Sequence, residues 1–248
     1  MVISEHMIID FHTHLGKPKR GVKRPEISSS VEDIIKIQEE ANINKSVIFA
    51  MPQEPSPERY KEANMKVFTA KGSFIPFIWI NPYFFNEKEV IDLVKKFNVK
   101  GIKLHSVFDG YYPSPEFLKN IIELSVKLNI PVLFHSLWGD LGDVKHIETV
   151  AENFPKAKIV IAHLKESGCI YVAKKLDNVY IDTSYCPHPR RIEQAVKVLG
   201  AEKIVFGSDF PFNDTVIQKM MIERAHIRLE EKELILGENA VKLLKVNK

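Results

Sequence analysis

Cysteine is scarce in this sequence. The chain of 248 residues contains two, Cys169 and Cys186, and neither belongs to a CxxC pair or lies beside a histidine pattern. This spacing excludes a zinc finger or a redox motif and fits a reducing compartment. Long apolar runs are also missing, because none approaches the roughly 20 residues needed to cross a bilayer. No basic, apolar and small-residue targeting signal precedes the first apolar segment, so we expect a cytoplasmic protein without a membrane partner.

An excess of charge of one sign is lacking as well. The sequence has 35 Lys and Arg against 32 Asp and Glu, a formal net charge of +3. The two signs alternate along most of the chain, so no basic block favours nucleic acid as a partner. The densest cationic stretch, residues 17–24, is either a solvated loop or a region that attracts an anionic substrate. No GxGxxG or Walker A loop follows any predicted strand, which disfavours a doubly wound nucleotide-binding fold.

Short apolar, β-branched or aromatic runs alternate with segments of helical periodicity, which is typical of repeated βα units. The predicted strands comprise residues 8–10, 46–50, 74–80, 101–104, 132–134, 159–162, 179–182 and 204–206. The predicted helices comprise residues 31–41, 57–70, 87–97, 115–128, 144–153, 168–176 and 191–199. Eight such units in a chain of nearly 250 residues predict the α/β class and one (β/α)8 TIM barrel, a single domain spanning residues 1–248.

Two local signals refine the predicted helices. Ser29 and Glu32 are spaced as a capping box for the helix at residues 31–41. The tail from Asp214 onward is expected to break into two or three helices, with Gly237 and Asn239 marking a turn.

Candidate chemical groups follow several of the predicted strands. His12 and His14 are two residues apart in the DFHTH segment, so both project to the same side at the end of the first strand. His135, His163 and Asp209 follow the fifth, sixth and eighth strands. An HxH pair alone is equally consistent with one core and one loop histidine. Five groups at the carboxyl ends of strands instead favour a catalytic site, because barrel enzymes place their catalytic residues there.

The segments DFHTH, GIKLH, FHS, IAHL, YIDTS and GSDFPF occur in this order, and with them the whole chain resembles the amidohydrolase superfamily. It is most similar to the branch that contains aminocarboxymuconate semialdehyde decarboxylase, the hydroxybenzoate-type decarboxylases and pyrone dicarboxylate lactonase. The resemblance implies four metal ligands: His12, His14, His135 and Asp209. It also implies that His163 polarises the metal-activated water or the substrate, and that Asp209 is a ligand, the acceptor of the water's proton, or both.

The expected cofactor is one divalent metal ion, zinc or alternatively manganese. Neutral imidazoles with one carboxylate suit these ions and leave a coordination position open for water. Lys103 and His105 in GIKLH both point inward by strand alternation. Lys103 is either carboxylated and bridges two metals, as in some members of the superfamily, or stays an amine that binds a substrate carboxylate; a single metal with a plain Lys103 is our expectation. His105 either contacts the substrate or one of the metal-binding side chains, or it is a histidine of the core.

Two further residues have alternative interpretations. Trp138 either forms a wall of the substrate pocket or anchors its own loop. Arg190 either binds a substrate carboxylate or lies on the surface of a helix. Asp10 and Asp182 are expected to orient histidines.

Two reactions share the predicted site. The first is hydrolysis of an amide, lactone or ester bond in a small molecule by a metal-activated water. The second is non-oxidative decarboxylation of an unsaturated or aromatic carboxylic acid. A barrel that only binds metal or a small molecule is disfavoured by the intact ligand set. We expect residues 15–30 and 108–112 to form lids, and the resemblance implies a homodimer.

Overall fold

The computed structural model describes residues 6–19, 27–137 and 139–247. Within them, eight parallel strands form one sheet in the order β1 to β8, each pairing with the next along the chain. The strands are β1 (Ile9–Leu15), β2 (Lys45–Ala50), β3 (Phe74–Trp79), β4 (Gly101–Leu104), β5 (Val132–Phe134), β6 (Ile159–Ile161), β7 (Val179–Asp182) and β8 (Ile204–Val205). The predicted (β/α)8 barrel is confirmed.

Backbone hydrogen bonds close the barrel between its first and last strands. Phe11 N donates to Phe206 O at 2.8 Å, and Asp209 N donates to His12 O at 2.8 Å. Thr13 and Phe210 form an isolated parallel bridge beyond β8. The segment that carries Asp209 is therefore attached directly to the end of β1.

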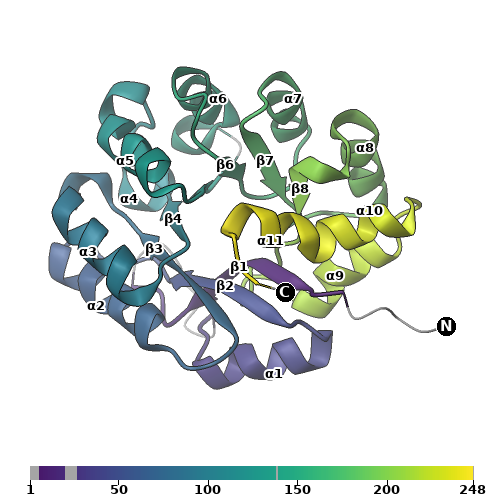
Figure 1. Ribbon diagram of the computed structural model, residues 1–248, viewed down its shortest axis with the longest axis horizontal. Coiled ribbons are helices and arrows are strands. Elements are labelled where there is room, and N and C mark those ends of the chain that lie inside the picture. Colours follow the sequence, from purple (N-terminus) through teal and green to yellow (C-terminus); the bar gives the residue numbers. More distant parts are fainter. Residues whose placement is uncertain (1–5, 20–26, 138, 248) are drawn as a thin grey trace.

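The helices lie outside the ring of strands, as Figure 1 shows. They are α1 (Val31–Ala41), α2 (Pro57–Thr69), α3 (Glu87–Phe97), α4 (Ser106–Asp109), α5 (Pro115–Leu128), α6 (Val144–Asn153), α7 (Gly168–Lys175), α8 (Pro189–Leu199), α9 (Thr215–Glu223), α10 (Leu229–Glu233) and α11 (Asn239–Leu244). Within the described ranges, no helix is long and apolar enough to cross a membrane.

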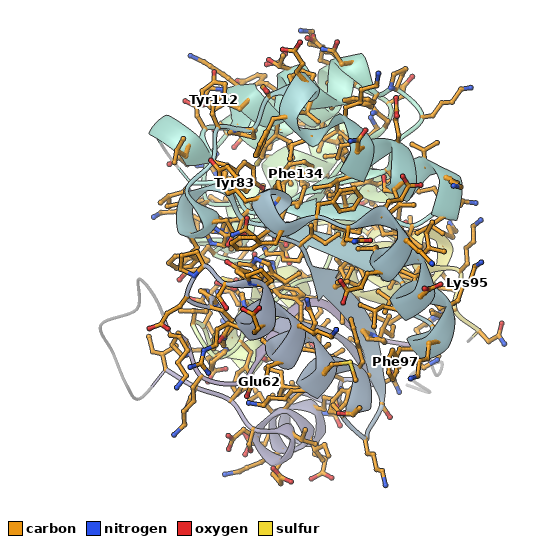
Figure 2. All side chains as sticks on the ribbon, turned by 90° about the vertical axis from the view of Figure 1, so that its left-hand side faces the viewer. Glu62, Tyr83, Lys95, Phe97, Tyr112 and Phe134 are labelled. Atoms are coloured by element: carbon orange, nitrogen blue, oxygen red, sulfur yellow. The ribbon has the colours of Figure 1, made fainter. Side chains whose placement is uncertain are left out.

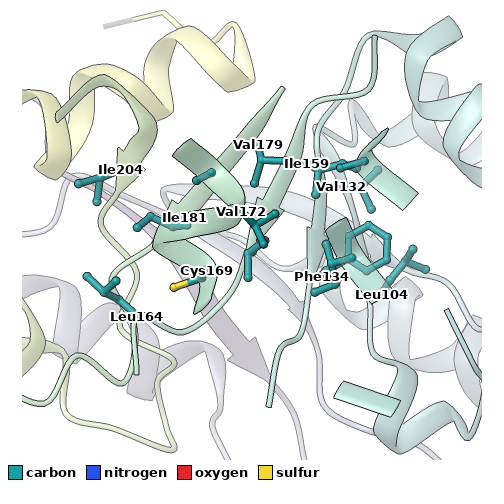
Figure 3. Packing of buried hydrophobic residues seen from close by; sticks show 14 of the residues in the cluster. Leu104, Val132, Phe134, Ile159, Leu164, Cys169, Val172, Val179, Ile181 and Ile204 are labelled. Atoms are coloured by element: carbon teal, nitrogen blue, oxygen red, sulfur yellow. The ribbon is translucent and has the colours of Figure 1, made fainter. Parts of the chain in front are cut away.

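An apolar layer between the strands and the helices holds the two together. Outward-facing residues such as Ile102 and Leu104 pack against the helices, and Figure 3 shows this layer around Leu104, Phe134 and Ile181. The intervening Lys103 lies with its Nζ 4.9 Å from the centre of the Phe49 ring, in the barrel interior. In Figure 2 the buried Phe134 lies within the outline of the molecule, and Lys95 projects at its edge.

β1 is longer than predicted. All seven of its residues are buried, including His12 and His14. The prediction ended the strand early because the polar residues of DFHTH interrupt the apolar run. In the barrel the side chains of these residues are enclosed by neighbouring strands. Both histidines therefore lie on the strand itself, where the register of β1 against β2 shifts between Asp10 and Thr13.

The predicted capping box of α1 was wrong by one residue. Ser30 Oγ accepts from Asp33 N at 3.1 Å, and an Asp33 oxygen accepts from Ser30 N at 2.8 Å. Ser29 is unavailable because its hydroxyl donates to His14 O and its backbone pairs with Gly16. It thereby fastens the chain to the end of β1.

The predicted turn at Gly237 and Asn239 was also wrong. A π-helical segment, η4 (Leu234–Glu238), joins α10 to α11, so the chain stays helical through Gly237. A Cβ at Gly237 would lie 1.7 Å from Met7 O. Glycine is needed here for close contact between the tail and the residues that precede β1, and α11 crosses β1 and β8 in Figure 1.

Candidate metal centre and active-site pocket

Three predicted ligands converge at the seam between β1 and β8. His12 Nε2 and His14 Nε2 each lie 3.0 Å from Asp209 Oδ1. All three residues are buried, and the described part of the chain presents them as a group able to hold a metal ion. The two histidines lie on β1, and Asp209 follows β8 on the segment hydrogen-bonded to His12.

The hydrogen bonds on the far side of each ring define its tautomer. His14 Nδ1 lies 3.2 Å from Ala50 O, and a carbonyl oxygen can only accept, so Nδ1 carries the proton. His12 Nδ1 lies 2.7 Å from Asp182 Oδ2, so it also donates. In the neutral rings both Nε2 lone pairs then face a carboxylate oxygen, and His12 Nε2 has no hydrogen-bond partner in the described structure. Three acceptor atoms this close together favour a cation, either a proton or a metal ion, between them.

The electrostatics of the cluster agree with a cation site. Burial lowers the pKa of His14 to about 4, so this ring is neutral at physiological pH. Burial opposes ionisation of Asp209, yet the neighbouring His12 and His14 hold the pKa of its carboxyl well below the ordinary value. For His12, burial and Lys103 lower the pKa, but Asp209 and Asp182 outweigh them and raise it. A proton and a metal ion therefore compete for the same His12 nitrogen.

Asp209 and His163 both have left-handed backbone, with φ 64° and φ 74°, and so does Tyr185 in the pocket wall, with φ 54°. This conformation is uncommon for residues other than glycine, and such strain, of order 1–3 kcal/mol, concentrates at functional sites. It turns the chain sharply where β6 and β8 end and directs both side chains into the mouth of the barrel.

His135 and His163 form a pair beside the three-residue cluster. His163 Nε2 lies 3.0 Å from His135 Nδ1, and His163 Nδ1 lies 2.8 Å from Ser184 Oγ. The His12 and His163 rings are stacked 5.1 Å apart. Within the described residues His135 is not part of the converging group, so the structure brings together three of the four predicted ligands and places the fourth one ring away.

Asp182 is the acidic partner of both parts of the site. Its Oδ2 accepts from His12, while its Oδ1 accepts from the backbone N of His163 at 2.9 Å and from Ser184 Oγ at 2.5 Å. It therefore orients histidines, as the sequence suggested. Asp10 does not, because it accepts from the backbone of His12 and from Ser208 N and Oγ. Asp10 fastens the β8 segment to β1.

Lys103 is fully buried and its Nζ has no hydrogen-bond partner among the described residues. Burial lowers its pKa to about 8, against the opposing pull of Asp209 and Asp182. An isolated cation in the barrel interior is unfavourable. Lys103 is thus a buried cation without a hydrogen bond, held near the Phe49 ring and attracted by Asp209 and Asp182.

His105 belongs to an aromatic stack that sequence reasoning missed. Its ring lies parallel to Trp79 at 5.5 Å and to His135 at 3.6 Å. Trp79 Nε1 donates to Asp109 Oδ2 at 3.0 Å, and Tyr60 OH also donates to Asp109. Trp79, His105 and His135 occur at the ends of β3, β4 and β5, so their shared position on consecutive strands is the signal that could have predicted the stack.

A cavity of about 520 Å³ opens above the cluster. Its walls are largely apolar and aromatic, and they also include the charged residues Asp143, Lys145, Lys165 and Glu166. The lining residues are His14, His105, Val107, Phe108, His135, Ser136, Leu137, Asp143, Val144, Lys145, His163, Lys165, Glu166, Gly168, Cys169, Tyr185, Asp209 and Phe212. The predicted residues His14, His105, His135, His163 and Asp209 thus share one pocket.

Other predicted residues lie elsewhere. Arg190 is not among the described residues that line this cavity; it lines a separate hollow with Glu193 and Arg224. Trp138 lies outside the described residues, as does part of the predicted lid at residues 15–30. In the other predicted lid, Phe108 lines the pocket, but Asp109 and Tyr111 are buried. Tyr112 at the end of the segment is exposed, so buried and exposed residues alternate after the end of α4.

The fold and the donor cluster define a barrel enzyme with a site suited to a divalent metal. A family model described as amidohydrolase matches residues 9–246, and the chain belongs to this family. It is an enzyme of the amidohydrolase superfamily, and the decarboxylase-like branch suggested by the sequence fits. A search of curated proteins found no match.

Solved structures share the fold at low sequence identity. 2,6-Dihydroxybenzoate decarboxylase from Rhizobium has a TM-score of 0.79 at 16% identity, over 97% of this chain and 99% of the other. 5-Carboxyvanillate decarboxylase from Sphingomonas paucimobilis has a TM-score of 0.78 at 12% identity, over 98% and 100%. A dihydroxybenzoic acid decarboxylase from Polaromonas sp. JS666, with bound manganese and 2-nitroresorcinol, has a TM-score of 0.78 at 16% identity, over 98% of both chains.

Proposed function

We propose that the protein is a metal-dependent carboxy-lyase that removes carbon dioxide from a small aromatic or unsaturated carboxylic acid. His12, His14 and Asp209 would hold one zinc or manganese ion, with His135 as a further ligand. The observation that carries the proposal is the apolar, aromatic-walled cavity directly above the donor cluster. The decarboxylases of similar fold support it by analogy.

The composition of the cavity suits this reaction. Phe108, Tyr185 and Phe212 line it, and aromatic side chains pack favourably against a planar substrate. A carboxylate moved from water into apolar surroundings is destabilised, whereas the charge that develops during loss of carbon dioxide is spread over the ring. The walls therefore favour release of carbon dioxide over retention of the acid.

The protein groups supply the protons. A bound divalent ion would polarise a substrate oxygen. The bond between the ring carbon and the carboxylate breaks, the electron pair stays on the carbon, and a proton replaces the carbon dioxide. We assign delivery of this proton to His163, because it lines the pocket and His135 is assigned to the metal ion.

Hydrolysis of a lactone, ester or amide is the second candidate. The specific observation in its favour is the carboxyl of Asp209, whose pKa is held well below the ordinary value by His12 and His14 despite burial. An ionised carboxylate in the pocket can accept a proton from an attacking water.

The deciding experiment measures carbon dioxide release. Protein stripped of metal and reloaded with zinc or manganese is incubated with 2,6-dihydroxybenzoate, 5-carboxyvanillate and a panel of lactones, esters and amides. We expect metal-loaded protein, but not metal-free protein, to release carbon dioxide from a carboxylic acid. Asp209→Asn should lower the rate of release by about 100-fold or more. Asp214→Asn is the matched control, because Asp214 caps α9 and asparagine caps equally well. Turnover of a lactone, ester or amide without carbon dioxide release would overturn the proposal in favour of hydrolysis.

A further inference from the structure

Ser184 follows β7 in the YIDTS segment and is completely buried beside the histidine pair. Its hydroxyl makes two hydrogen bonds: Oγ donates to Asp182 Oδ1 at 2.5 Å and lies 2.8 Å from His163 Nδ1. A serine hydroxyl has one proton to donate. Because that proton is directed at the carboxylate, Oγ must accept from His163, and His163 Nδ1 carries a proton.

The same reasoning extends to the next ring. With Nδ1 protonated, the neutral His163 presents a lone pair at Nε2. That nitrogen lies 3.0 Å from His135 Nδ1, so His135 Nδ1 must donate. The chain of donors runs from His135 through His163 and Ser184 to Asp182, and it leaves His135 Nε2 without a proton.

We propose that Ser184 is a positioning residue that sets the tautomers of His163 and His135 and so keeps His135 Nε2 free to bind the metal ion. The metal-binding consequence rests on the proposed function, whereas the tautomers follow from the hydrogen bonds alone. Without the hydroxyl, His163 Nδ1 loses its acceptor and its proton can move to Nε2. His135 would then accept at Nδ1 and carry its proton on Nε2, where it blocks metal binding.

Asp182 is the final acceptor of this row of hydrogen bonds and fixes its direction. Its Oδ1 also accepts from the backbone N of His163 at 2.9 Å and of Ser184 at 3.0 Å. Three donors converge on this one oxygen, so the direction of the Ser184 hydroxyl cannot reverse while Asp182 is present. Outer partners of this kind usually change metal affinity by 10- to 100-fold when removed.

The test compares Ser184→Val with Ser184→Thr, which have nearly the same shape but differ in the hydroxyl. Nitrogen NMR of ¹⁵N-histidine-labelled, metal-free protein at pH 8 reports which ring nitrogen carries the proton.

Competition with a chelator measures the zinc dissociation constant. We expect Ser184→Val to move the His163 and His135 protons and to raise the zinc dissociation constant 10- to 100-fold. Ser184→Thr should retain the wild-type tautomers and stay within about threefold in affinity. Ser184→Ala provides the same comparison if the larger side chains prevent folding.

Asp182→Asn serves as the control for indirect effects. The amide oxygen can keep the three donors at the Oδ1 position, so its NH2 group faces His12 and the His163 and His135 signals should stay as in wild type. Wild-type tautomers in Ser184→Val and Ser184→Ala would overturn the proposal, and so would equal losses in the Val and Thr variants. Shifted tautomers with unchanged zinc affinity would remove the positioning role. The NMR result stands whatever the reaction is, so failure of the carboxy-lyase assignment would be seen separately.

Discussion

At the scale of single residues, Lys103 combines complete burial with a charge that no hydrogen bond satisfies. Burial lowers its pKa from 10.5 to about 8. The folded protein therefore binds fewer protons than the unfolded chain between about pH 8 and 10.5. The unfavourable contribution of Lys103 is fully present below pH 8 and disappears as the pH rises towards 10.5.

Because charged Lys103 destabilises the fold below pH 8, we predict that Lys103→Met stabilises the metal-free protein. The shift corresponds to at most about 3 kcal/mol of unfolding free energy at pH 7, and the gain should shrink between pH 8 and 10. Urea denaturation of both proteins across this range measures it. Lys88→Met on exposed α3 is the control and should change little. A variant less stable than wild type at pH 7 would show that Lys103 makes a favourable interaction in the fold.

At the scale of elements, the C-terminal helices support the strand that carries two of the ligands. Gly237 in η4 contacts Met7 just before β1, and Phe206 N donates to Ile235 O at 2.8 Å. The helical tail thus contacts both sides of the β1 and β8 seam, at the residues that precede β1 and at the residue that follows β8.

We predict that Gly237→Ala destabilises the protein by about 1–3 kcal/mol, the usual penalty for overpacking. The added Cβ would meet the backbone of Met7, so the tail or the start of β1 must move. Chemical denaturation measures the loss, and zinc affinity shows whether the shift reaches His12 and His14. Lys242→Ala on the exposed face of α11 is the control. Wild-type stability in Gly237→Ala would mean that this contact is not needed.

At the scale of the whole molecule, the proposed metal site links the first and last strands of the barrel. His12 and His14 belong to β1 and Asp209 follows β8, so an ion would cross-link the seam in addition to its backbone hydrogen bonds. The unfolded chain lacks this arrangement because about 195 residues separate the ligands. Metal binding should therefore favour the closed barrel as a unit.

We predict a metal-dependent rise in melting temperature. Zinc at about 100 times its dissociation constant should add roughly 2.7 kcal/mol to the unfolding free energy. His14→Ala should lose most of this gain, and His226→Ala, a histidine exposed on the surface, should keep it. Calorimetry with and without a chelator measures both. An equal rise in wild type and His14→Ala would place the stabilising ion elsewhere.

The sequence by itself determined the fold class, and it predicted where the candidate site lies. Apolar runs in alternation with helical segments defined eight βα units, since both periodicities are local properties of the chain. The positions of His12, His14, His135, His163 and Asp209 after strands predicted one shared pocket, because all parallel strands end at the same face.

Only the tertiary structure decided which of these side chains lie together. It joined His12, His14 and Asp209 into one cluster and paired His135 with His163, since distances between rings depend on strand register and barrel closure. Ser184 acquired its role from His163, and no local pattern marks such a hydrogen bond. The stack of Trp79 on His105 depends on the positions of consecutive strands and not on a local pattern. Arg190 lies outside the pocket because α8 begins at Pro189, two residues earlier than predicted, and Arg190 lines a separate hollow.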